Sequence, residues 1–130
     1  MAPRNCTTRY AEAAARGRDA EAAAARYLEA HCLRILLRNY RCRMGELDLV
    51  AQERDGTLVI AEVRLRSRQD YGGAAASVGH HKQLRLVRAG RHLLATRPQW
   101  SRCAVRFDVL DVRPTPRGHE IHWIRHAFSS

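Results

Sequence analysis

The segment at residues 45–66, GELDLVAQERDGTLVIAEVRLR, constrains the fold of this chain most strongly. It predicts two β-strands, at 46–51 and 58–66, joined by a turn at 54–57. The Asp-Gly pair in that turn is typical of tight β-hairpins, because such turns need residues that tolerate unusual backbone angles. The segment therefore predicts an antiparallel hairpin at the centre of the fold.

Acidic residues occupy both strands of this hairpin. Side chains alternate between the two faces of a strand, so Glu46 shares a face with Asp48, and Glu62 shares one with Arg64. The second strand is otherwise apolar, so we expect Glu62 to lie in or beside apolar surroundings. A buried carboxylate is costly without a partner. The partner is a divalent cation, Arg64, or both.

The hairpin predicts a candidate metal site. A short turn brings Asp48 and Glu62 onto adjacent strands, which lie about 4.8 Å apart. Two carboxylates at that distance repel each other unless a cation lies between them. Their oxygen atoms suit Mg²⁺ or Mn²⁺, which could activate water and polarise a phosphodiester. Arg64 would then supply a further cation near the attacked phosphate.

The charge of the chain favours a polyanionic partner. The 130 residues have the length of one domain, and 23 Lys and Arg against 13 acidic residues give a net charge of +10. Arginine suits phosphate because its guanidinium binds two oxygens at once. A genome of high GC content would explain why Lys82 is the only lysine, but it would not explain the net charge. We therefore expect a nucleic acid as partner.

The remaining elements are predicted from periodicity and from helix-ending residues. Asp19 is expected to cap a first helix, and Gly17 to interrupt the alanine-rich segment before it. Residues 67–79 have the composition of a loop, either a plain connector or a backbone that approaches phosphate. We expect a poorly determined segment at 1–16 and a single domain at 17–130 of order αβββαββ. Besides the hairpin, its elements are helices at 20–31 and 80–96 and strands at 33–40, 103–112 and 119–125.

Several classes of protein are not expected from the sequence. The N-terminal residues lack the apolar core of a signal peptide, and no apolar run reaches the about 20 residues of a membrane helix. The four cysteines have no CxxC pair, so we expect neither a zinc site nor disulfides, but reduced thiols and a cytoplasmic location.

A resemblance to a known family rests on four stretches of the sequence. GELDLVA is followed by VIAEVRLRS, then by YGGAAASVGHHKQLRL and later by RFDVLDV. From about Arg16 to Phe128 the chain resembles the YraN-like family of small bacterial proteins. That family resembles the PD-(D/E)xK nucleases, and in shape the archaeal Holliday-junction resolvases. The resemblance implies a restriction-endonuclease-like α/β core, a mixed central sheet flanked by helices.

The resemblance also implies roles for individual residues. It makes Asp48 and Glu62 metal ligands and Glu21 the first-helix acid that completes the site, whereas the local pattern alone favours a dipole-complementing role for Glu21. Arg64 stands where the nuclease pattern has lysine, and Gln83 matches a polar position near the site. Glu46 would lie just behind the ligands. The basic side chains expected to contact nucleic acid are Arg41, Arg43, Arg66, Arg68, Lys82 and Arg85.

Two functions follow as hypotheses. The first is an Mg²⁺- or Mn²⁺-dependent endonuclease that hydrolyses DNA. The analogy with the resolvases suggests that it would act as a homodimer. The second is a non-catalytic nucleic-acid-binding module on the same fold, in which Arg64 pairs with Glu62 and takes the place of the metal. Arginine stays protonated, so an arginine in place of the lysine cannot act as a base or exchange a proton with water during catalysis.

Overall fold

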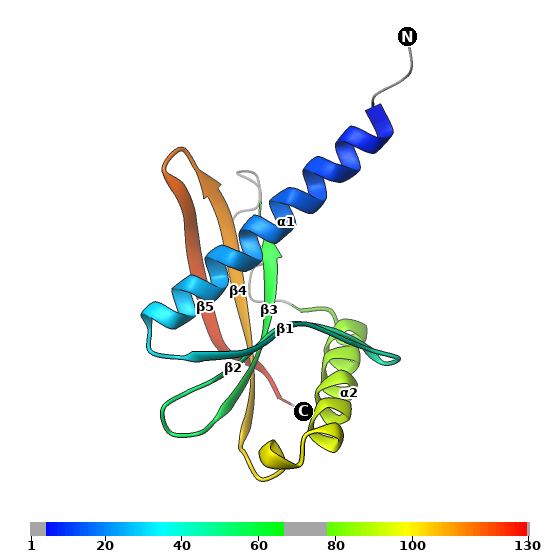
Figure 1. The fold of residues 1–130 in the computed structure, drawn as a ribbon, viewed down its shortest axis with the longest axis vertical. Helices are drawn as coiled ribbons and strands as arrows, with labels where there is room; N and C mark the ends of the chain where they lie inside the picture. The colour runs from blue at the N-terminus through cyan, green and yellow to red at the C-terminus, as the bar shows by residue number, and fades with distance from the viewer. Residues whose placement is uncertain (1–4, 67–77, 130) are drawn as a thin grey trace.

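The computed structural model describes residues 5–66 and 78–129 and has one five-stranded mixed sheet with a helix on each face (Figure 1). The strand order β1-β2-β3-β4-β5 follows the chain; β3 and β4 are parallel, and the other neighbours are antiparallel. The predicted α/β class and the order αβββαββ are confirmed. The elements are α1 (Asn5–Ala30), β1 (Arg34–Cys42), β2 (Gly45–Gln52), β3 (Leu58–Leu65), α2 (His80–Thr96), the 3-10 turn η2 (Pro98–Trp100), β4 (Val105–Thr115) and β5 (Gly118–Phe128).

Two hydrophobic clusters hold the helices to the sheet. On one face, the alanine-rich stripe of α1 around Ala24 and Leu28 packs against β2, β3 and β4. On the other face, Leu86 and Leu93 of α2 pack against the same strands and against Phe128 at the end of β5. Small side chains on α1 let that helix approach the sheet closely. The central strands are therefore covered on both faces, which explains their nearly continuous apolar sequence.

The first helix begins earlier than predicted. It starts at Asn5 and passes through both Gly17 and Asp19, so Asp19 does not cap it, and Figure 1 shows its N-terminal part extending beyond the sheet. Alanine has the highest helix propensity, so the alanines on either side of Gly17 offset the cost of about 1 kcal/mol that glycine brings. The predicted interruption at Gly17 was wrong for this reason.

The fourth strand is buried along most of its length. Alternating apolar and charged residues are typical of a strand with one exposed face, but Asp108 is 0% exposed and Asp111 is 6% exposed. The reason is topological, because β4 lies between β3 and β5. Asp108 accepts hydrogen bonds from the Arg106 guanidinium, Trp123 Nε1 at 2.8 Å and the backbone N–H of His126 at 2.9 Å. These donors satisfy a carboxylate that would otherwise be costly to bury.

Most of the predicted loop at 67–79 lies outside the described residues, which resume at Val78. Neither described helix is long and apolar enough to cross a membrane.

Candidate functional site

The candidate site begins where β2 separates from β3. The hydrogen-bonded ladder between them runs from Gln52–Leu58 to Leu49–Ala61 and stops there. Asp48 follows at the end of this ladder, and its Oδ2 accepts a hydrogen bond of 2.9 Å from the backbone N–H of Val63. The side chain of Asp48 thus bridges to β3 where backbone pairing ends. This contact fixes the carboxylate beside β3, as the hairpin predicted.

Glu62 of β3 lies at the same place and is bound by a lysine of α2. Its side chain is 7% exposed, and its Oε1 lies 2.6 Å from Nζ of Lys82, whose side chain is 49% exposed. Lys82 is in the first turn of α2, so the packing of that helix on the sheet determines where the ammonium group lies. The cationic partner of this buried carboxylate is therefore Lys82.

The two carboxylates influence each other electrostatically. Burial raises the pKa of Asp48 from 3.8 to about 7, and the negative charge of Glu62 contributes the next largest increase. The hydrogen bond from Val63 and the charge of Lys82 act in the opposite direction. Burial and a like charge both disfavour the ionised form. Asp48 and Glu62 thus form an acidic pair that lacks full compensation by the protein.

Glu21 approaches this pair from α1. Burial raises the pKa of Glu21, and a hydrogen bond with the Asn39 side chain opposes the increase. The charges of Glu46 and Glu62 raise the pKa further, so Glu21 lies within electrostatic reach of the β2–β3 carboxylates. The role of Glu21 as the third acid of the site stays a prediction, since no three acidic side chains of the described residues are grouped to hold a metal ion.

The structure places Arg64 beside Asp111, whereas the non-catalytic hypothesis paired it with Glu62. Its Nε lies 2.9 Å from Oδ1 of Asp111, and Arg66 contacts the same oxygen at 3.3 Å. The parallel register of β3 and β4 sets Arg64 directly beside Asp111. Arg64 thus contacts a carboxylate of β4, and Lys82 makes the ion pair with Glu62.

Gln83 and the remaining basic residues lie around this centre. The Gln83 side chain donates to the carbonyl oxygen of Val78 at 2.7 Å and so fixes the start of α2. Arg41 is highly exposed and lies 3.7 Å from Glu46, a surface pair. Arg43 and Arg85 are exposed, and Arg68 lies outside the described residues.

A pre-formed metal site is not present in this arrangement. Among residues 5–66 and 78–129, no three His, Cys, Asp or Glu side chains are grouped so that they could hold a metal ion. The donors that do meet are two carboxylates, Asp48 and Glu62. Magnesium is commonly bound by one or two carboxylates together with water and substrate phosphate. The pair fits a cation that substrate helps to bind.

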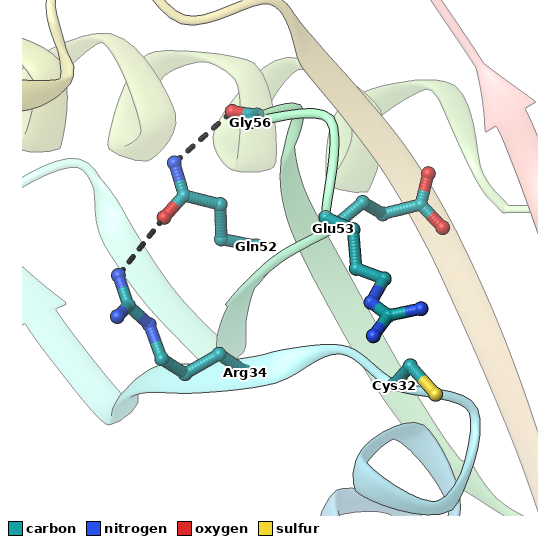
Figure 2. Close-up of a pocket in the computed structure, with 6 residues that line it drawn as sticks. Cys32, Arg34, Gln52, Glu53 and Gly56 are labelled. Carbon is teal, nitrogen blue, oxygen red and sulfur yellow. Dashed lines mark hydrogen bonds between the residues drawn. The ribbon is translucent and has the colours of Figure 1, made fainter.

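A separate hollow of about 330 Å³ lies at the other end of the β2–β3 hairpin (Figure 2). Its polar groups largely bind each other, because Arg34 donates to Gln52, and Gln52 donates to the carbonyl oxygen of Gly56. Glu53 is paired with Arg106 at 2.9 Å. These bonds brace the β2–β3 turn, so we place the candidate site at the carboxylates and not in this hollow.

Two features of the site could not be recognised from the sequence pattern. Lys82 was expected only to contact nucleic acid, although its being the sole lysine could have drawn attention to it. Asp111 was not singled out, since its role depends on β4 lying parallel to β3 in the observed register. Both features depend on tertiary packing between segments that are far apart in the chain.

The comparisons with known proteins agree with the motifs. The model of the uncharacterised protein family UPF0102 matches residues 20–112. A UPF0102 protein of Alcanivorax borkumensis is 47% identical over 115 residues, which is 88% of this chain and 91% of that protein. One of Nitrosomonas europaea is 48% identical over 113 residues, covering 87% and 92%. The expected membership is confirmed: the chain belongs to the UPF0102, or YraN-like, family.

Proposed function

We propose that this protein is a metal-dependent nuclease whose reaction centre is formed by Asp48 and Glu62. The observation that supports this best is the convergence of the two carboxylates at the end of the β2–β3 ladder, where burial and Glu62 raise the pKa of Asp48 to about 7. Carboxylates with strongly perturbed pKa values are common at functional sites. The net charge of +10 supports a polyanionic substrate.

A bound Mg²⁺ or Mn²⁺ would relieve the repulsion between the carboxylates and supply Lewis-acid activation of water and of the phosphoryl group. Asp48 and Glu62 would hold it, and Glu21 would stay behind them in its hydrogen bond with Asn39. The substrate phosphate would complete the ligand set. This requirement couples cation binding to substrate binding.

Lys82 is the cation that we assign to the reacting phosphate. Its ammonium group lies beside Glu62 and is half exposed, so it can turn toward a ligand without leaving the site. Arg64 is held by Asp111, which it shares with Arg66. We therefore assign to Lys82 the charge-stabilising role for which the nuclease pattern uses its lysine, and to Arg64 a role in fixing the end of β3.

The second candidate function is a module that binds nucleic acid without cutting it. The 2.6 Å ion pair between Lys82 and Glu62 favours it, because an ammonium already neutralises one of the two carboxylates. In this alternative the ion pair is permanent, and the basic surface alone serves the function.

Calorimetry with Mg²⁺ and Mn²⁺ distinguishes the two functions. The titrations are made with and without a duplex DNA whose phosphates are replaced by phosphorothioates that resist cleavage. The nuclease proposal expects cation binding that is strengthened by DNA and abolished in the double variant Asp48→Asn, Glu62→Gln. Glu29→Gln, which removes one exposed carboxylate from the end of α1, serves as the control and should bind normally.

Cleavage of labelled DNA with each cation completes the test. Cutting by the parent protein that is lost in Asp48→Asn would support the nuclease. DNA binding without any cation binding, in the presence of the phosphorothioate duplex, would overturn the nuclease in favour of the non-cutting module.

A further inference from the structure

The turn between β1 and β2 exposes a large apolar side chain. Met44 is 47% exposed, more than Leu65 at 39% or Leu84 at 38%, which are the other exposed large hydrophobic side chains of the described chain. The ladder pairs Cys42 directly with Gly45, so Arg43 and Met44 are the two residues of the turn. Neither residue has a positive φ, so the turn tolerates many residue types and does not itself require a methionine. Met44 also belongs to neither hydrophobic cluster, so its exposed side chain is available for contact with a partner.

The tip of this hairpin extends beyond the sheet. β2 pairs with β1 from Gly45 onward, whereas it pairs with β3 only from Leu49 onward. Gly45 has φ +148°, and a Cβ built on it would lie 3.7 Å from the carbonyl oxygen of Arg85. The tip thus lies against α2, and Figure 1 shows the hairpin extending past that helix. Contact with α2 fixes the direction in which Met44 is presented.

Basic side chains surround this apolar tip. Arg43 precedes Met44, and Arg85 lies under Gly45. Arg41 is on the same hairpin with a side chain that is 79% exposed, and its pairing with Glu46 at 3.7 Å is of the surface kind that contributes little. Lys82 lies about one helical turn before Arg85 on α2. An apolar residue framed by arginines matches duplex DNA, where phosphates flank a stack of apolar base faces.

We propose that the β1–β2 hairpin is a DNA wedge, in which Met44 inserts between base pairs while Arg41, Arg43 and Arg85 bind the flanking phosphates. This inference rests on the proposed function. Apolar wedges of this kind partly unstack a base step and kink the duplex. A step already weakened by a nick costs least to unstack, so nicked duplex is the expected ligand. A single thioether is too small to anchor a protein in a lipid surface, which favours DNA over an anionic membrane.

The strand sets the distance from the wedge to the carboxylates. Met44, in the turn, precedes Asp48 of β2 by four residues, and at about 3.3 Å per extended residue this corresponds to at most about 13 Å. Base pairs are about 3.4 Å apart, so the kink would lie about four base pairs from the phosphate at the site. The wedge would thus place a defined phosphate at Asp48 and Glu62.

The test uses a nicked duplex with 2-aminopurine beside the nick, because this base becomes brighter when it unstacks. The parent protein is expected to bind nicked duplex about tenfold more tightly than intact duplex and to increase the fluorescence. Met44→Ser should lose the brightening and most of the preference, while its affinity for intact duplex changes less than about twofold. Met44→Leu keeps an apolar side chain of similar size and should behave like the parent.

Two results would overturn the wedge alone. One is a Met44→Ser variant that keeps both the nick preference and the brightening while the parent binds intact duplex in a salt-dependent way; this leaves the proposed function standing. The other is Met44-dependent binding to anionic phospholipid vesicles with no effect on DNA. Failure of the parent to bind any DNA at low salt would overturn both the wedge and the proposed function.

Discussion

At the scale of single residues, Asp48 is held where its neutral form is favoured. Its pKa in the folded protein is about 7, against an ordinary value of 3.8. Between these values the folded protein keeps a proton that the unfolded chain releases. The stability that this proton contributes is complete below about pH 4 and is lost as the pH rises through about 7. Asp48 therefore lowers stability at neutral and alkaline pH, as is common for residues kept for function.

Asp48→Asn is expected to remove this penalty. An amide keeps an oxygen that can accept the hydrogen bond from Val63 and has no charge to bury. The variant should be more stable than the parent by on the order of 4 kcal/mol at pH 8 and equal to it near pH 4, because a pKa raised from 3.8 to about 7 corresponds to that free energy at about 1.4 kcal/mol per pH unit. Urea unfolding at both pH values measures the difference.

Asp55→Asn provides a control of opposite sign. The hydrogen bond from the backbone N–H of Thr57 lowers the pKa of the exposed Asp55. This variant should therefore gain no stability at pH 8. An equal gain for Asp48→Asn at both pH values would contradict the assigned environment of Asp48.

The two cationic residues near the site are expected to respond differently to substitution. Lys82→Met leaves the buried Glu62 without its partner and should cost about 1–3 kcal/mol at pH 7 and reduce DNA cleavage more than about 100-fold. Arg64→Lys keeps a cation beside Asp111 and should change cleavage less than about fivefold. Urea unfolding and cleavage rates measure both effects.

Lys82→Arg separates the loss of charge from the loss of a specific ammonium group. It should retain the stability of the parent, because a cation still faces Glu62. A cleavage rate that falls with Arg64→Lys but not with Lys82→Met would contradict the roles assigned here.

At the scale of elements, the first helix shows how local signals can mislead. Gly17 lies in the middle of α1, and a Cβ built there meets nothing within 4 Å. Gly17→Ala should therefore raise stability by about 0.5–1 kcal/mol, since alanine has the higher helix propensity and no clash opposes it. Chemical unfolding and helix content by circular dichroism measure the gain.

Gly90 of α2 offers the matched comparison. A Cβ built there would lie 2.9 Å from Cδ1 of Ile60, because α2 packs closely on β3 at this point. Gly90→Val should therefore destabilise by about 1–3 kcal/mol through overpacking. If Gly17→Ala brings no gain in stability, the helix is interrupted at Gly17, as the sequence pattern predicts.

The β2–β3 hairpin could be predicted from the sequence, but the pairing of Lys82 with Glu62 could not, for one physical reason. Alternation and the Asp-Gly turn are local, so they were sufficient to bring Asp48 and Glu62 together on adjacent strands. The partner of Glu62 comes from α2, and the partner of Arg64 comes from β4. Those contacts depend on how a helix packs and on the register of a parallel pair, neither of which a single segment encodes.

At the scale of the whole molecule, the net charge of +10 gives the surface a positive field whatever the chemistry of the site. Several of its cations are committed inside the fold: Arg106 to Glu53 and Asp108, and Arg64 and Arg66 to Asp111. Exposed arginines such as Arg41 and Arg43 remain on the β1–β2 hairpin beside α2. Binding of DNA should therefore use a limited number of phosphates near this hairpin.

The dependence of DNA binding on salt tests this view. If on the order of five phosphates are contacted, affinity should fall roughly 10²–10³-fold between 50 and 200 mM salt, since the logarithmic slope is about −0.9 per phosphate. Arg43→Ala should weaken binding and make that slope shallower by about one. Arg34→Ala removes the same charge at the opposite end of β1, where Arg34 is bound to Gln52, and should leave the slope unchanged. Equal slopes for all three proteins would place the phosphate contacts elsewhere. Equal changes in both variants would mean that total charge, and not the hairpin surface, governs binding.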